Sequence, residues 1–125
     1  MGLIDALDDM HREEAAILDD IVLSQPGIGE NPDFFLARAA WQRGVALGTK
    51  MGTLFPANRN SELPVVQGGY VLFDGTNGQP LASIDGTELT YLKTAADSGL
   101  GSRQLARADC RRLLMVGAGG LAPHL

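Results

Sequence analysis

The chain has 125 residues, of which 45% are hydrophobic and 20% charged. This length and composition suit one modest globular domain. The formal net charge of −5, with no dominant basic patch, argues against nucleic acid or an anionic membrane as the main partner.

Cellular location and redox state are constrained by what the sequence lacks. Its one cysteine, Cys110, excludes a disulfide within the chain and suits a reducing compartment. No apolar run reaches the ~18 residues that a membrane-spanning helix needs. The first residues also lack the basic-then-apolar order of a signal peptide. We therefore expect a cytoplasmic protein.

The first half of the chain predicts a helix, a loop and a strand. Apolar residues recur at three- and four-residue steps from residue 3 to about 18, which predicts an amphipathic helix. The prolines and glycines of "SQPGIGENPD" predict a loop. Residues 33–41 fit both a strand and a short helix, and we favour the strand.

The second half contains clearer strand signals. Residues 45–55 alternate with period two up to Pro56, as a strand does. The runs "VVQGGYVLF" and "PLASID" flank the turn formers of "DGTNGQ", which predicts a β-hairpin. A helix is expected from about residue 88 to 106, and a final short strand over 112–116. The expected fold class is α+β, a sheet layered with helices.

The last residues predict the opening of a second domain. Gly117, Gly119 and Ala122 follow the apolar run at the spacing G-x-G-x-x-A, which suits a turn that holds phosphates. We expect a boundary near residue 108, with residues 1–108 as one domain and 109–125 as the truncated start of another. Strand 112–116 would then need partners from another copy or from the first domain, or be poorly ordered.

The two lysines occupy unusual places. Lys50 lies on a predicted strand between Gly48 and Gly52, which would leave space for a ligand around its ammonium. The alternative is a lysine that protects an edge strand from aggregation. Lys93 falls within the apolar stripe of the 88–106 helix, where an ammonium needs an anionic partner. Alternatively it lies at the margin of the stripe and reaches water.

Other kinds of site find little support. His11 and His124 lie far apart, and no serine or cysteine sits at a strained turn beside them, so no nucleophilic triad is visible. The same two histidines and Cys110 have no ligand spacing, and we expect no metal.

Four segments in order carry a family resemblance: "LGTKMGTLFPAN", "GGYVLFDGTNGQPLASIDGTELT", "KTAADSGLGSRQLAR" and "LLMVGAGGLA". Over residues 44–122 the chain resembles the ornithine cyclodeaminase/mu-crystallin family, which includes archaeal-type alanine dehydrogenase and imino-acid reductases. The resemblance implies a two-domain, usually dimeric enzyme that uses NAD or NADP. Residues 1–108 would be its substrate-binding and dimerisation domain, and 109–125 the start of a Rossmann domain.

The resemblance also assigns roles to residues. Lys50 and Lys93 would bind the substrate carboxylate. Thr94 would lie near the cofactor phosphates. The predicted cofactor-binding residues are completed by the glycine turn: Gly117, Gly119, Gly120 and Ala122. The family's catalytic aspartate would lie in the missing domain, so the catalytic residue is unknown.

Two departures from the family pattern bear on the substrate. Lys93 stands where an arginine is usual. The two parallel hydrogen bonds that a planar guanidinium can donate to a carboxylate are therefore lost. A further arginine, expected before the "PG" loop, has no clear counterpart in "LDDIVLSQP". These departures favour a small amino acid or a cyclic imino acid over ornithine.

The expected function is therefore that of an NAD(P)-dependent enzyme acting at the Cα of a small amino or imino acid, such as an imino-acid reductase or amino-acid dehydrogenase. Ornithine cyclodeaminase, which forms proline and ammonia from ornithine, is one alternative. A non-catalytic, mu-crystallin-like binding protein or dimerisation module is another. Without the cofactor domain, the 125 residues are expected to be inactive and to bind the cofactor weakly or not at all.

Overall fold

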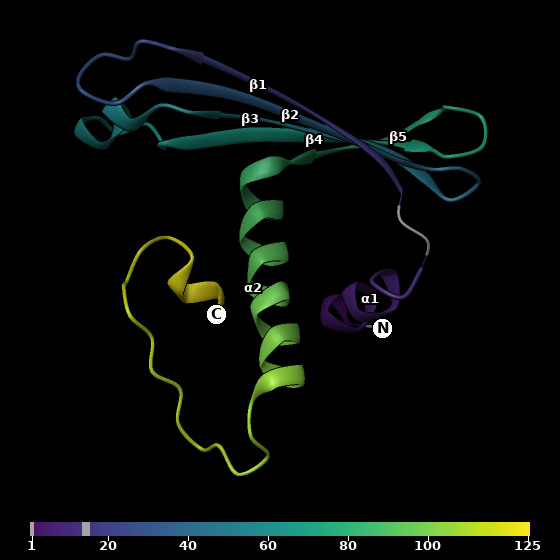
Figure 1. Ribbon diagram of the computed structural model, residues 1–125. Coiled ribbons are helices and arrows are strands. Elements are labelled where there is room, and N and C mark those ends of the chain that lie inside the picture. Colours follow the sequence, from purple (N-terminus) through teal and green to yellow (C-terminus); the bar gives the residue numbers. More distant parts are fainter. Residues whose placement is uncertain (1, 14–15) are drawn as a thin grey trace. The chain divides into compact units, whose positions relative to one another are not determined.

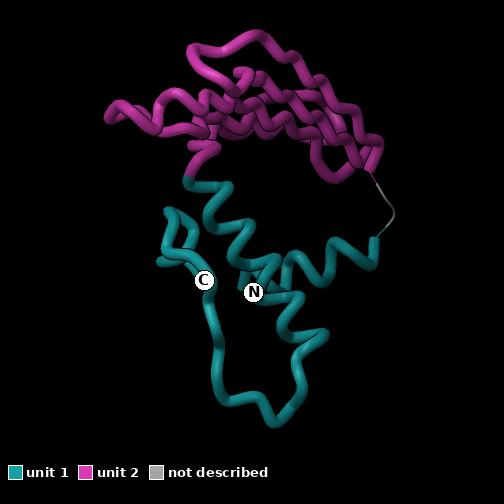
Figure 2. The backbone as a smooth tube through the Cα atoms, turned by 60° about the vertical axis from the view of Figure 1, so that its left-hand side comes forward, with its two compact units in different colours: residues 1–14, 88–125 teal, residues 15–87 magenta. Residues whose placement is uncertain are grey.

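The computed structural model describes residues 2–13 and 16–125 (Figure 1). Contacts divide the chain into two compact units, shown in Figure 2. One comprises residues 15–87, and the other combines residues 1–14 with residues 88–125. The domain boundary predicted near residue 108 would separate two domains of a longer protein. The two compact units do not test it, and it stays a prediction.

A five-stranded antiparallel sheet forms the 15–87 unit (Figure 1). Each strand pairs with the next one in the sequence. The strands are β1 (Ile17–Gln25), β2 (Asp33–Gln42), β3 (Ala46–Leu54), β4 (Val66–Asp74) and β5 (Pro80–Asp85). The strands predicted around residues 33–41 and 45–55, and the hairpin, are confirmed. A short 3-10 helix, η1 (Pro56–Asn60), follows β3.

The predicted helix from residue 3 to about 18 is wrong beyond its first turns. Helix α1 spans only Leu3–Met10, and the chain enters β1 at Ile17. Residues 14 and 15 of the predicted helix lie outside the described residues. Ile17 and Ile21 fit a helical step of four, but a strand also places them on one face. Antiparallel pairing along the whole of β2 selects the strand.

The β4–β5 hairpin turns at the position that the sequence indicates. Asp74 Oδ1 accepts hydrogen bonds from the backbone N–H groups of Thr76, at 2.7 Å, and Asn77, at 3.1 Å. These two backbone donors lower the pKa of the Asp74 carboxyl. At the same end of the sheet, Trp41 Nε1 donates to the Gly75 carbonyl oxygen at 3.0 Å. The turn is therefore held by its own polar groups and by a tryptophan from β2.

Helix α2 (Gly86–Leu105) begins directly after β5 and confirms the predicted helix. Asp85 Oδ1 accepts the backbone N–H of Thr87 at 2.7 Å, as an N-terminal cap does. Gly86 is buried, and a Cβ there would lie 2.6 Å from the carbonyl carbon of Gly68 and the nitrogen of Gly69. The first residue of α2 therefore abuts the backbone of β4, and only glycine allows this approach.

In the other unit, α1 and the last turns of α2 are linked. Arg103 Nη1 donates to Asp5 Oδ1 at 3.0 Å, and a Cβ on Gly99 would lie 2.8 Å from Ile4 Cδ1. The Arg103 hydrogen bond, with a smaller contribution from the Gly2 backbone, lowers the pKa of Asp5. Among the described residues, Ala96 is the one apolar side chain that is buried.

The C-terminal segment departs from the prediction. Residues 112–116 form no strand, and residues 111–118 have no regular secondary structure. A strand there needs hydrogen-bonded neighbours, and in the described chain β1–β5 pair only with one another. The segment ends in a three-residue 3-10 helix, η2 (Ala122–His124).

Large apolar side chains remain exposed on the sheet, most of all on β1, where every residue is exposed. Ile17 is 77% exposed and Val22 60%. Within the part of the chain that is described, no helix combines the length and apolar character needed to cross a membrane.

Candidate functional site

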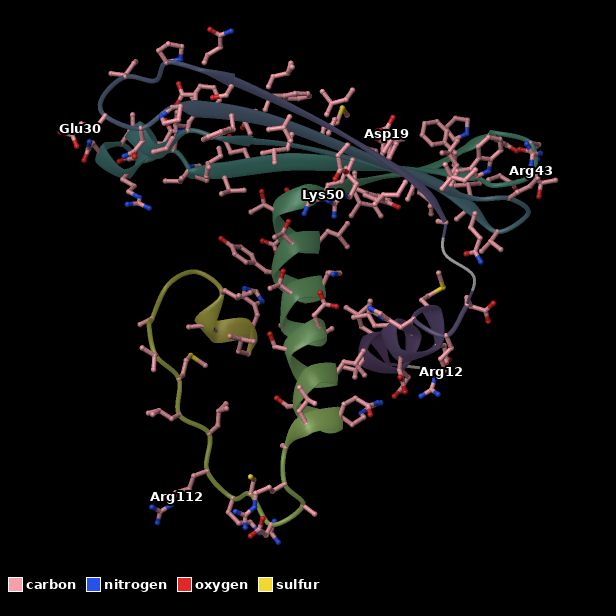
Figure 3. All side chains as sticks on the ribbon, in the orientation of Figure 1. Arg12, Asp19, Glu30, Arg43, Lys50 and Arg112 are labelled. Carbon is pink, nitrogen blue, oxygen red and sulfur yellow. The ribbon has the colours of Figure 1, made fainter. Side chains whose placement is uncertain are left out.

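Lys50 lies near the middle of β3, the central strand, in a row of polar side chains that runs across β1 to β4. The pairing register places Asp20 of β1 opposite Arg38 of β2, Arg38 opposite Lys50, and Lys50 opposite Tyr70 of β4. Residues directly opposite one another project from the same face of a sheet. We call these four residues the Lys50 row. Figure 3 labels Lys50 together with Asp19, which alternation places on the other face.

The outer half of the Lys50 row is an ion pair with two hydrogen bonds. Arg38 Nε donates to Asp20 Oδ1 at 2.6 Å, and Arg38 Nη2 donates to Asp20 Oδ2 at 2.5 Å. The Arg38 hydrogen bond lowers the pKa of Asp20, and the same contact raises the pKa of Arg38. Both side chains are solvent-exposed, so their pairing fixes geometry more than it adds stability.

The space expected beside Lys50 is open on one side only. A Cβ on Gly48 would lie 1.9 Å from Tyr70 Oη, so the Tyr70 phenol occupies the place above Gly48. The expectation of open space at both glycines is therefore wrong at Gly48. At Gly52 the nearest atom to an added Cβ is the Gln67 carbonyl oxygen, at 3.4 Å. A ligand would approach Lys50 from the Gly52 side or past Arg38.

Lys93 lies at the exposed margin of α2 and does not face a core. Its side chain is 53% exposed, and it forms an ion pair with Asp97 one turn later. Of the two interpretations left open for Lys93, the structure fits the one that places it at the margin of the stripe, and its neighbour Leu92 is also 53% exposed. Asp97 is therefore the anionic partner of the Lys93 ammonium. The predicted role of Lys93 in substrate binding stays a prediction.

The two lysines belong to different compact units. Lys50 lies in the 15–87 unit and Lys93 in the 88–125 part of the other. Their expected convergence on one ligand therefore stays a prediction.

Of the predicted cofactor residues, Gly120 lies against Tyr91 of α2. A Cβ on Gly120 would lie 2.9 Å from Tyr91 Oη, and the His124 ring stacks on Tyr91 with centroids 4.8 Å apart. Tyr91 and Thr94 are three residues apart, so they share a helix face. Figure 1 and Figure 2 both show the C-terminal segment running back beside α2. Tyr91 thus brings the glycine turn toward the side of α2 that carries Thr94.

These residues show part of the backbone geometry of a phosphate-binding turn. Gly117 has the positive φ of 111° that such a turn uses, and a Cβ on Gly119 would meet no atom within 4 Å. However, residues 112–116 form no strand, and Ala122 begins a helix of only three residues. Phosphates are bound by the N–H groups and dipole of a full helix N-terminus. The described residues also contain no group of three or more metal-ligating side chains.

Sequence reasoning missed Asp20, Arg38, Tyr70 and Tyr91. The first three become neighbours of Lys50 only through the strand register, and that register could not be read while residues 33–41 fitted both a strand and a helix. Tyr91 lies three residues before Thr94 in the predicted helix, which was a usable signal.

The chain thus contains a five-stranded antiparallel sheet with Lys50 in its central strand, followed in the sequence by helix α2, which is an α+β composition. The model of the ornithine cyclodeaminase/mu-crystallin family matches residues 34–124, and the chain belongs to this family. The sequence-based recognition and the α+β fold class are thereby confirmed.

Relatives and solved structures agree. Protein SAR DEFICIENT 4 of Arabidopsis thaliana is 47% identical over 98 residues, covering 76% of this chain and 30% of that protein. A Δ1-pyrroline-2-carboxylate reductase of Paracoccus denitrificans is 39% identical over 122 residues, covering 98% of this chain and 37% of the reductase. The crystal structure of the iminosuccinate reductase of Paracoccus denitrificans in complex with NAD+ matches with a TM-score of 0.75 and 28% identity, over 98% of this chain and 37% of that one. The chain therefore spans about a third of the length of these relatives.

Proposed function

We propose that the chain supplies the substrate-binding part of an NAD(P)-dependent reductase of small imino acids, of the class of Δ1-pyrroline-2-carboxylate. The observation that carries the proposal is the position of Lys50. It lies in the central strand of the sheet, inside the segment that the family model matches. The 39% identity over 98% of the chain to a Δ1-pyrroline-2-carboxylate reductase supports this substrate class.

The chemistry of such a substrate explains what the chain would do. An imino acid of this class carries a carboxylate on the carbon of its C=N bond, and reduction saturates that bond. An ammonium that holds the carboxylate fixes the position of the neighbouring carbon, which turns an encounter into an oriented reaction. Lys50 fills this role, with Lys93 as the second cation from α2.

The proposed organisation follows the expectations from the sequence. Residues 1–108 serve as the substrate-binding and dimerisation domain, and residues 109–125 lead into a domain that binds NAD or NADP. Thr94 and the turn of Gly117, Gly119, Gly120 and Ala122 contribute to the phosphate side of that site. The arrangement of the glycine turn against Tyr91 supports this assignment.

We also propose that the sheet face opposite Lys50 mediates homodimerisation. We call it the Asp19 face, after the aspartate that β1 carries there. Ile21 is 56% exposed there and Leu23 58%. Both faces of β1 expose apolar side chains, and since the Lys50 face is assigned to the substrate, we assign the interface to the other face. Ile21→Asp should shift the chain toward monomer in sedimentation analysis, whereas Val22→Asp, on the other face of β1, should not.

A chimeric enzyme tests the reductase proposal. Residues 1–125 replace the matched segment of the Paracoccus Δ1-pyrroline-2-carboxylate reductase, and consumption of reduced nicotinamide is followed with Δ1-pyrroline-2-carboxylate. The chimera should turn over, and the 125-residue chain alone should not. Lys50→Met should raise KM by roughly ten- to a hundredfold, the worth of a charge-assisted hydrogen bond, and Lys50→Arg by less.

The same chimera separates the alternatives. Ammonia release from L-ornithine with oxidised cofactor, and none of the reductase reaction, would favour a cyclodeaminase. Ligand binding without turnover of either substrate would favour a mu-crystallin-like binding protein. A Lys50→Met chimera with an unchanged KM would refute the role of Lys50.

A further inference from the structure

Arg38 is the residue of the Lys50 row whose presence needs an explanation. It is the one charged residue among the apolar and small side chains of β2 between Phe34 and Trp41. The register places it directly opposite Lys50, and two like charges in that position destabilise a sheet. An edge lysine or arginine is often explained by protection against aggregation, but β2 is an interior strand. A different reason is therefore needed.

The ion pair with Asp20 leaves part of the guanidinium available. Its two hydrogen bonds use Nε and Nη2 of Arg38, so the Nη1 group lies outside the pair. Because Asp20 lies on the β1 side, Nη1 belongs to the guanidinium edge turned away from Asp20. Asp20 thus holds the guanidinium plane of Arg38 through one edge of the group, and the Nη1 edge is left outside this pair.

We infer that Arg38 is a further carboxylate-binding residue beside Lys50, with Asp20 as its positioning residue. This inference rests on the proposed function, because it needs a carboxylate at Lys50. It also compensates for one departure from the family pattern, the lysine at position 93. The Lys93 ammonium is a point charge at a position where a planar guanidinium is usual. The Arg38 guanidinium, from β2, places a planar donor next to the carboxylate.

The experiment compares L-proline with L-prolinamide, in which the carboxylate is replaced by an amide. L-proline is the reduction product of Δ1-pyrroline-2-carboxylate and is chemically stable. Affinities of both ligands for the 125-residue chain are measured by NMR titration. The ratio of the two affinities reports carboxylate recognition, and partial loss of folded protein lowers both affinities together without changing it.

Arg38→Met should reduce that ratio roughly tenfold, and Arg38→Lys should reduce it less, because the charge stays while the fork is lost. Asp20→Asn should reduce it several-fold, with partial rescue by Asp20→Glu. Arg43→Met is the matched control. Arg43 lies over the Trp41 ring, 4.5 Å from its centroid, outside the Lys50 row, and its loss should leave the ratio unchanged.

The outcomes separate the two proposals. If Lys50→Met abolishes the preference for L-proline while Arg38→Met keeps the wild-type ratio, the role of Arg38 is refuted and that of Lys50 stands. If the wild-type chain does not prefer L-proline to L-prolinamide, both are refuted. A reduced ratio in both variants, with Arg43→Met unchanged, supports both.

Discussion

Gly86→Ala probes the junction that fixes the start of α2 on the sheet. The new Cβ would lie 2.6 Å from the Gly68 carbonyl carbon and the Gly69 nitrogen, and 2.8 Å from the Gly68 oxygen. Carbon atoms prefer separations of about 3.5–4.0 Å, so the contact is short by about 1 Å. All three atoms belong to the backbone of β4, which cannot swing aside as a side chain can.

The expected cost of Gly86→Ala is about 1–3 kcal/mol in the free energy of unfolding, the usual range for overpacking. Gly101→Ala is the matched control in the same helix, because a Cβ there meets no atom within 4 Å. It should stabilise the chain by about 0.5–1 kcal/mol through helix propensity. The two substitutions are chemically identical and should have opposite signs.

Trp41, the one tryptophan of the chain, provides the assay. Its Nε1 is bonded to Gly75 of the hairpin, so its fluorescence reports unfolding of the sheet. Denaturant titration of each variant, followed by Trp41 fluorescence for the sheet and by far-ultraviolet circular dichroism for α2, gives the midpoint and the slope. Equal stability of Gly86→Ala and wild type, with an unchanged slope, would refute the close approach of α2 to β4.

Two further predictions concern the hairpin and the site. Asp74→Asn should lower the thermal stability at about pH 7. The variant should also lose less thermal stability than the wild type when the pH falls below about 4. The sign follows from the lowered pKa of Asp74, whose contribution is complete above its unfolded-state value and is lost as the pH falls through the folded-state value. Gly48→Ala should destabilise the sheet by about 1 kcal/mol, because its Cβ would meet Tyr70 Oη. In a Tyr70→Ala background the same change should cost less, and additive costs would contradict the contact.

Most of the sheet could be predicted from sequence because its strands alternate clearly or are bounded by turn formers. β3 and the β4–β5 hairpin show both signals. β1 could not be predicted, because Ile17 and Ile21 fit a helix as well as a strand and pairing with β2 decides between them. Residues 112–116 carry the composition of a strand, but within the described part of the chain they pair with no other strand.

The site was predictable in part for a similar reason. Lys50 stands out through the glycines around it, and the family resemblance assigns it a role. Its neighbours in the row depend on register, which joins residues distant in the sequence, so Arg38 and Asp20 could not be recognised. The burial of Lys93 was overestimated because the helical stripe has a wide margin, at which Leu92 and Lys93 are both exposed.

The central claim, that the Lys50 row binds a carboxylate, is tested most directly by mapping L-proline onto the chain with amide NMR shifts. Concentration-dependent shifts are expected at Arg38, Lys50 and Tyr70; they should disappear in Lys50→Met and be much weaker with L-prolinamide. Shifts confined to other strands, or equal shifts with both ligands, would contradict it.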